Sequence, residues 1–247
     1  MEQVFLKKSQ KMETKIDNLD IEKLKVRIDN EKDIGKIIKL IEWIADRDLE
    51  LAEGLVWSID LEKLKDRIDA EQSIQEIAYC IGNIAYVSED IAEELVWLLD
   101  IEKLKERVDA EEDIETIGMC ISAICDGSSE VAKKLTNTLD FEKLKDKVDR
   151  EEDIEKIRDF LWKIGFGGGK VAKKIVGCLD AEKLKKKIEE EKDTKKIGLC
   201  VVAIHRQGNC ELASKLVSQL NPENAKTPEV KEFIINLKTQ YQNQKFH

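Results

Sequence analysis

A short phrase recurs in this chain at a fixed interval of 40 residues. One copy is Leu99–Asp109, with the sequence LDIEKLKERVD. The five copies begin at Leu19, Ile59, Leu99, Leu139 and Leu179, and an altered sixth start stands at Leu220-Asn221. A fixed period of this length is typical of repeat proteins, in which each copy has an apolar face that only a neighbouring copy can cover.

Apolar residues within one copy follow helical spacing. In the copy that begins at Asp100, they recur at steps of three and four, as Leu104 and Val108 and then as Ile114, Ile117, Ile121 and Ile124. Residues that commonly cap helices, Asp113 and Ser128, precede the second and third apolar runs. We therefore predict helices over about 101–111, 114–126 and 129–139, each begun by a capping residue. Ser73–Glu76 of the preceding copy also has the pattern of a capping box.

The repeat predicts the fold class and the division of the chain. We expect an all-α protein, an α-solenoid of five three-helix repeats of about 40 residues, closed by a capping helix at each end. The predicted units are an N-terminal cap over 1–19, repeats over 20–59, 60–99, 100–139, 140–179 and 180–220, and a C-terminal cap helix and tail over 221–247. Thr227-Pro228 is the expected start of that last helix.

Three helices in a repeat of this length resemble armadillo-type and related HEAT-type proteins. If the repeat is taken to begin at Glu89, then 89–99, 101–111 and 114–125 correspond to the three armadillo helices. Third-helix endings such as Ile81–Ala85 (IGNIA) are similar to the armadillo ending, although Asp replaces the family's glycine between the first two helices. The resemblance implies a curved array whose third helices line a concave groove, in which a column of Asn residues holds an extended peptide.

The columns that vary between copies indicate where a partner would bind. The Asn column reads Trp43, Asn83, Ala123, Lys163 and Ala203, and a column four residues earlier reads Lys39, Tyr79, Met119, Asp159 and Leu199. One Asn in five excludes a regular ladder, and the absence of Trp from the earlier column gives no support for a nuclear-import receptor. Our candidate partner-binding residues are Trp43, Tyr79, Asn83, Tyr86, Met119, Trp162, Lys163 and Phe166. The aromatic members of this set are candidates for binding, and the alternative is that they fill gaps between repeats. We expect Trp57 and Trp97 to serve packing.

Charge is concentrated in the middle of the chain. The net charge is -10, and residues 60–99 alone hold 10 acidic and 3 basic side chains, a balance of -7. Such a surface repels phosphate backbones, so a nucleic-acid partner is disfavoured, and it attracts a basic peptide or protein. The alternative is that the acidic residues only maintain solubility.

No combination of residues indicates catalysis or metal binding. The chain has six cysteines without a CxxC pair, and its two histidines are His205 and His247. Cys80, Cys120 and Cys200 fall in one apolar column, where cysteine serves as a small hydrophobic residue. Gly165–Lys170 (GFGGGK) lacks the spacing of a phosphate-binding loop, so we expect a turn between helices. We expect no enzyme activity, cofactor, metal ion, small-molecule ligand or membrane span, and a cytoplasmic location suited to free thiols.

The sequence thus favours a non-enzymatic scaffold that binds a peptide or protein, with a basic segment as one candidate, in a concave groove. The alternative is a sensor or scaffold region of a larger signalling or defence ATPase system.

Overall fold

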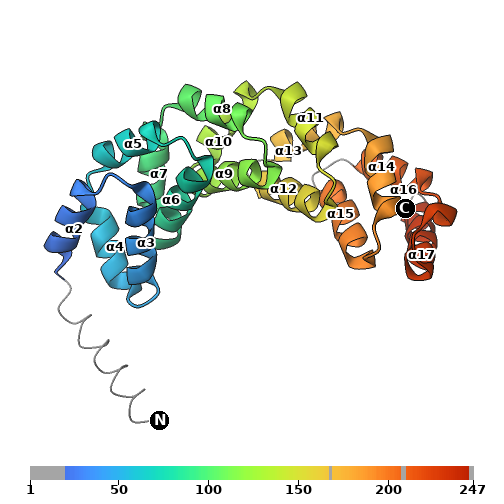
Figure 1. Cartoon of the computed structure of the whole chain (residues 1–247), viewed down its shortest axis with the longest axis horizontal. Helices are drawn as coiled ribbons and strands as arrows, with labels where there is room; N and C mark the ends of the chain where they lie inside the picture. The colour runs from blue at the N-terminus through green and yellow to red at the C-terminus, as the bar shows by residue number, and fades with distance from the viewer. Residues whose placement is uncertain (1–19, 167–168, 207–209, 245–247) are drawn as a thin grey trace, which may run out of the picture.

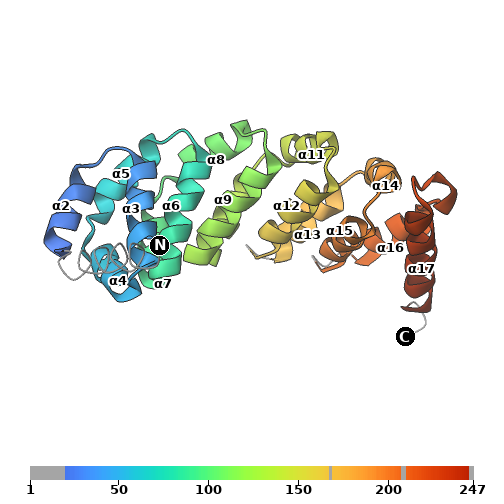
Figure 2. The same cartoon turned by 60° about the horizontal axis from the view of Figure 1, so that its bottom comes forward.

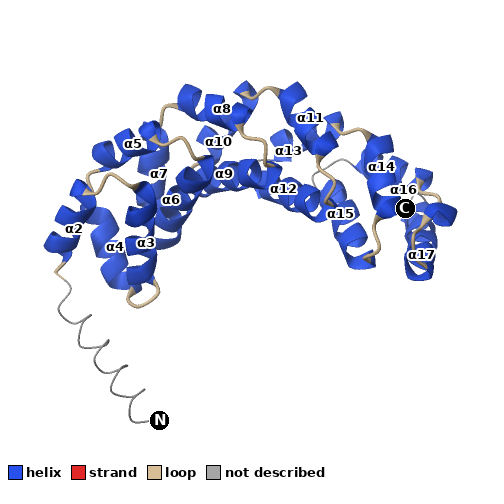
Figure 3. Ribbon diagram, in the orientation of Figure 1, coloured by secondary structure: helices blue, strands red, loops and turns tan. Residues whose placement is uncertain are grey.

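The protein is described by a computed structural model that covers residues 20–166, 169–206 and 210–244. The predicted N-terminal cap over 1–19 lies outside the described residues, as do the middle of the glycine-rich turn and the last three residues. Every regular element in the described ranges is a helix and none is a strand, which confirms the all-α prediction (Figure 3).

The helices follow one another with short connections. They are α2 (Ile21–Asn30), α3 (Ile34–Ala45), α4 (Leu49–Ser58), α5 (Leu61–Ala70), α6 (Ile74–Val87), α7 (Glu89–Leu98), α8 (Ile101–Ala110), α9 (Ile114–Gly127), α10 (Ser129–Thr138), α11 (Phe141–Arg150), α12 (Ile154–Phe166), α13 (Gly169–Cys178), α14 (Ala181–Glu190), α15 (Thr194–Arg206), α16 (Cys210–Gln219), a short 3-10 helix η1 (Pro222–Asn224) and α17 (Pro228–Gln244). Helices α8, α9 and α10 agree with the predicted ranges to within one residue at each end.

Capping residues set most of these starts. The Asp100 carboxylate accepts hydrogen bonds from the backbone N–H groups of Glu102 and Lys103, both at 3.2 Å. The Asp113 carboxylate accepts from the Thr116 backbone N–H at 3.1 Å. Thr227 caps α17 by accepting from the Val230 N–H at 3.2 Å, as its place before Pro228 predicts.

Two details of the predicted caps are wrong. The Ser73 hydroxyl accepts from the Glu76 N–H at 3.3 Å, as a capping box requires. The Ser73 N–H, however, donates to Glu71 Oε1 at 2.9 Å, whereas in a capping box it would donate to the Glu76 carboxylate. The same carboxylate position precedes the other helices of this row; Glu111, for example, accepts from the Asp113 N–H. Ser128 occupies the cap position of α10 but makes no side-chain cap hydrogen bond.

The helices form an arch. Helices α5, α8, α11 and α14 lie along its outer side, and α6, α9 and α12 lie along its inner side (Figure 1). Figure 2 shows α3, α6, α9, α12 and α15 following one another as a row, and each helix of this row packs against the next. The helices of a further row, α4, α7, α10, α13 and α16, each pack against the preceding inner helix.

One apolar core runs through the described chain from Leu24 to Ile234. Cys80, Cys120, Phe160 and Cys200 occupy equivalent positions of the inner row and are all buried. The large Phe160 fits because Gly118 faces it on the neighbouring helix. A Cβ atom at Gly118 would lie 3.3 Å from the Phe160 Cα, so glycine allows α9 and α12 to approach closely.

A basic side chain joins each outer helix to the preceding one. The Arg67 guanidinium on α5 donates to the backbone carbonyl oxygens of Ile28 at 3.0 Å and Asp29 at 2.6 Å, in the last turn of α2. The same contact follows 40 residues on at each step, from Arg107 to Ile68 and Asp69, from Lys147 to Asp109 and from Lys187 to Val148 and Asp149. We call Arg67, Arg107, Lys147 and Lys187 the repeat clamp. These donors add hydrogen bonds to carbonyl groups in the last turn of each helix, where the helix itself supplies few donors.

The carboxylates beside the clamp also connect repeats. The side chains of Lys105 and Asp109, four residues apart on α8, form an ion pair with Nζ and Oδ2 2.8 Å apart. The Asp109 side chain, however, is only 12% exposed, and its Oδ1 accepts from the Asp140 N–H of the next repeat at 3.2 Å. The charged phrase is therefore a joint between repeats as well as an outer surface.

Candidate binding surfaces

Aromatic side chains are exposed along the inner row. Trp43 on α3 is 39% exposed, Tyr79 and Tyr86 on α6 are 45% and 71% exposed, and Trp162 on α12 is 38% exposed. Their helices lie along the concave side of the arch (Figure 1). These four side chains define what we call the inner surface. Exposed aromatic groups on the helices of one side make this side a candidate interaction surface.

Two of these rings carry basic groups over their faces. The Arg47 guanidinium carbon lies 4.5 Å from the centre of the Trp43 ring, and that of Arg206 lies 5.2 Å from the centre of the Trp162 ring. Arg47, in the turn after α3, also donates to the Trp43 backbone carbonyl oxygen at 2.7 Å, which holds its side chain against the end of that helix. The two ends of the inner surface therefore combine aromatic and positively charged groups, a pairing that stabilises both.

The other predicted site residues are placed less favourably for a ligand. The Asn83 amide donates to the Tyr79 backbone carbonyl oxygen at 2.9 Å, and Lys163 Nζ forms an ion pair with Glu115 on α9 at 3.3 Å. Met119 is half-buried against the core. The side chain of Phe166 lies outside the described residues.

The Asn column is not a uniform wall. Trp43 and Asn83 are accessible at this position, whereas Ala123 and Ala203, at the same position of later repeats, are buried in the core. The residues of this column differ between copies, which suggested that packing does not constrain them. Packing does constrain Ala123 and Ala203.

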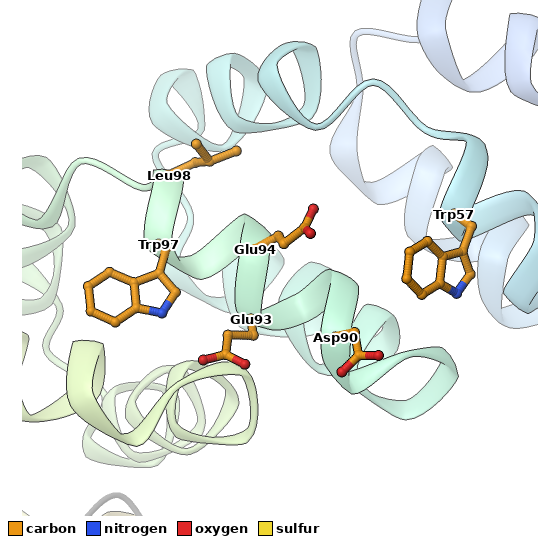
Figure 4. A pocket seen from close by; sticks show the side chains of 6 residues that line it. All are labelled: Trp57, Asp90, Glu93, Glu94, Trp97 and Leu98. Atoms are coloured by element: carbon orange, nitrogen blue, oxygen red, sulfur yellow. The ribbon is translucent and has the colours of Figure 1, made fainter.

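A second surface lies on the row of α4 and α7. Trp57 and Trp97, which we expected to be packing residues, are 54% and 44% exposed, so that expectation is wrong. With Leu98 they line a hollow of about 640 Å³ together with the three carboxylates of Asp90, Glu93 and Glu94 (Figure 4). We call this the acidic hollow. A signal for it was present in the sequence, since the two Trp residues are 40 apart and four acidic residues stand together at 89–94.

Buried thiols are poor candidates for chemistry. Burial raises the pKa of Cys80, Cys120 and Cys200 to about 12, which disfavours the thiolate that a nucleophile or metal ligand requires. Near the other end, Cys210 Sγ lies 3.9 Å from His205 Nε2. No group of three or more His, Cys, Asp and Glu side chains with a metal-binding arrangement occurs within the described ranges.

Comparisons with known proteins assign no family. No protein-family model matches the chain, and no curated protein matches it. A solved structure from "Computational Design of Self-Assembling Cyclic Protein Homooligomers" aligns with 90% of this chain and 88% of its own, at 18% identity and a TM-score of 0.18. Similarity at this level places the chain in no family. None of the helices in the described part of the chain is long and apolar enough to cross a membrane.

Proposed function

We propose that this chain is a non-enzymatic scaffold that binds a peptide or protein segment along the inner surface. The observation that carries the proposal is the exposure of four large aromatic side chains on helices of the concave side. Tyr and Trp supply much of the binding energy in protein interfaces because they bury a large area with few rotatable bonds. Exposed in the free chain, they gain most when a partner covers them.

We further propose that the array is an α-solenoid of the armadillo or HEAT kind, divided into the five repeats that the 40-residue period predicts. The order of the helices and the succession of contacts from α3 through α6, α9 and α12 to α15 support this assignment. In proteins of that kind, the equivalent helices line the groove that receives a partner.

The inner surface itself carries both signs of charge. At the end of α3 and in the turn after it, Glu42 and Asp46 stand close in sequence to Trp43 and Arg47, and Arg206 accompanies Trp162 at the other end. The net negative charge of the chain therefore does not by itself determine which partner the inner surface binds. We expect aromatic and apolar side chains of the partner to contribute most of the affinity, with charged groups fixing its orientation.

The proposal is tested by selecting peptides from a displayed random library on the immobilised chain. The selected peptides are then measured against a variant that carries Tyr79→Ala, Tyr86→Ala and Trp162→Ala together. We expect affinity to fall by at least about 100-fold, because three hot-spot aromatic residues each contribute about 1 kcal/mol or more.

The matched control is Val26→Ala on α2, which shortens an exposed apolar side chain outside both the inner surface and the acidic hollow. Hydrogen exchange should show protection by the peptide on α6 and α12. Peptides that bind the triple variant as tightly as the unaltered chain would show that the inner surface is not the binding site.

A further inference from the structure

The acidic hollow has a lining of unusual composition. Trp57 comes from α4, and Asp90, Glu93, Glu94, Trp97 and Leu98 come from α7. Figure 4 shows the three carboxylates between the two indole rings in that view, with Glu94 directed toward the side on which Trp57 lies. Every lining side chain is thus either apolar or negatively charged, a combination suited to a cation that has an apolar stem.

The next repeat contains the same arrangement with a cation in it. Lys134 Nζ on α10 lies 4.2 Å from the centre of the Trp97 ring and 3.4 Å from Glu130 Oε1. One indole and one carboxylate therefore hold this ammonium group. The residues 40 positions earlier are Trp57, Asp90 and, in the place of Lys134, Glu94.

The earlier repeat therefore keeps the indole and the carboxylate but replaces the lysine with a further carboxylate. Within the described chain no basic side chain lies over the Trp57 ring, although cations lie over Trp43, Trp97 and Trp162. We propose that the acidic hollow binds a lysine or arginine side chain of a basic partner segment, with the cation on the Trp57 ring and the carboxylates of Asp90 and Glu94 around it. This surface is separate from the inner surface, and its occupant does not depend on the function proposed there.

Charge explains why such a partner would be held. Helix α7 carries four acidic side chains and no basic one, so the field at the hollow is negative. A cation from a partner is attracted by that field and gains the attraction of the indole face, for which tryptophan is the strongest of the aromatic residues. The negative field would also speed the approach of a basic segment.

A basic segment of another protein fits better than a second copy of this chain. The equivalent helices nearer the C-terminus do carry lysines, but two of these are already placed on rings of their own chain. Lys134 lies over Trp97, and Lys174 Nζ lies 3.8 Å from the centre of the Phe141 ring. Docking them into another copy would require breaking these contacts.

The test measures the anisotropy of a fluorescein-labelled peptide of alternating lysine and glycine at low salt, with a glutamine-for-lysine peptide as the uncharged control. Trp57→Ala should weaken binding about three- to five-fold, the value expected for one exposed cation–π contact. Glu94→Lys should weaken it at least about ten-fold, because it supplies the missing lysine from within the chain. Trp57 is half exposed, so both variants are expected to fold, which circular dichroism checks.

Glu211→Lys on α16 is the matched control, since it changes the net charge by the same amount at an exposed site far along the row. It should change binding less than two-fold, as should the triple variant of the inner surface. If Glu211→Lys and Glu94→Lys lowered the affinity equally, the peptide would be responding only to the net charge of the chain, and the proposal would be wrong. Unchanged binding in Trp57→Ala would also overturn it. So would a dimer, seen by sedimentation velocity, that Glu94→Lys dissociates, because the occupant would then be a second copy.

Discussion

The Arg67 guanidinium donates to the backbone carbonyl oxygen of Asp29 at 2.6 Å, across 38 residues of sequence. The contact joins the last turn of one repeat's outer helix to the last turn of the outer helix before it. Its equivalents at Arg107, Lys147 and Lys187 give the outer side of the arch a hydrogen-bonded chain in addition to its apolar core.

Removing a clamp side chain should destabilise the fold. We expect Arg107→Ala to lower the free energy of unfolding by about 1–2 kcal/mol, because it removes the guanidinium hydrogen bonds to the Ile68 and Asp69 carbonyl oxygens at the end of α5. Arg107→Lys should keep most of the stability, since Lys147 and Lys187 fill the same position in later repeats. Urea unfolding followed by circular dichroism measures both. Lys103→Ala, which removes an exposed pair with Asp100, is the control and should cost under about 0.5 kcal/mol.

Stability should fall in acid because of the Asp residues that begin the outer helices. Hydrogen bonds from backbone N–H groups lower the pKa of Asp60, Asp100 and Asp180 below the usual value, with Lys63, Lys103 and Lys183 as the main donors. A folded-state pKa below the unfolded one gives stability that is present above the unfolded pKa, near 4, and is lost as pH falls through the folded pKa. The urea concentration at the midpoint of unfolding should therefore fall as the pH is lowered from about 5 to about 2.

Asp100→Asn provides the control for this pH effect, because asparagine caps helices without titrating. The variant should show a smaller drop in the urea midpoint over the same interval. A drop as large as that of the unaltered chain would mean that Asp100 contributes nothing to the acid dependence.

The thiols should differ widely in reactivity. With a pKa raised to about 12 and no exposure, Cys80, Cys120 and Cys200 should resist iodoacetamide at pH 8 in the folded chain, whereas the exposed Cys210 should react. Peptide mass spectrometry after timed alkylation separates the sites, and all of them should react in urea. Alkylation of Cys120 as fast as Cys210 in the folded chain would contradict the buried placement.

Two helical glycines should respond to alanine in opposite directions. A Cβ at Gly127 would lie 2.7 Å from Val96 Cγ2 and 3.0 Å from the Ala92 carbonyl oxygen, so Gly127→Ala should lower the free energy of unfolding by about 1–3 kcal/mol. A Cβ at Gly82 meets nothing within 4 Å, so Gly82→Ala should raise it by about 0.5–1 kcal/mol through helix propensity. Equal effects from urea unfolding would contradict the close approach of α9 and α7.

The helices could be read from the sequence because their determinants are local. Apolar spacing and capping residues such as Asp113 act within a few residues, so the predicted bounds of α8, α9 and α10 agree closely with the observed ones. The clamp was not predicted because the Arg107 partners are backbone atoms 38 and 39 residues away. Every residue has a backbone carbonyl group, so the sequence does not show which of them accepts a hydrogen bond.

The binding surfaces were predicted only in part, for a similar reason. Variability between copies pointed to Tyr79 and Trp162, but it also pointed to Ala123, which the core covers. Trp57 and Trp97 repeat at 40 residues, and repetition is the usual sign of packing. The structure instead places Trp57 of α4 and Trp97 of α7 in the lining of one hollow, together with three carboxylates.

The clamp also has a consequence for how such a chain can lengthen. Each repeat from the second to the fifth brings a basic donor, and the repeat before it offers the carbonyl acceptor, so a copy of an internal repeat inserted between two others carries both halves of the joint. Arg107 and Lys147 make equivalent contacts with different chemistry, so the joint tolerates divergence once it has been copied. Duplication of repeats within the gene could therefore change the length of the arch in steps of 40 residues.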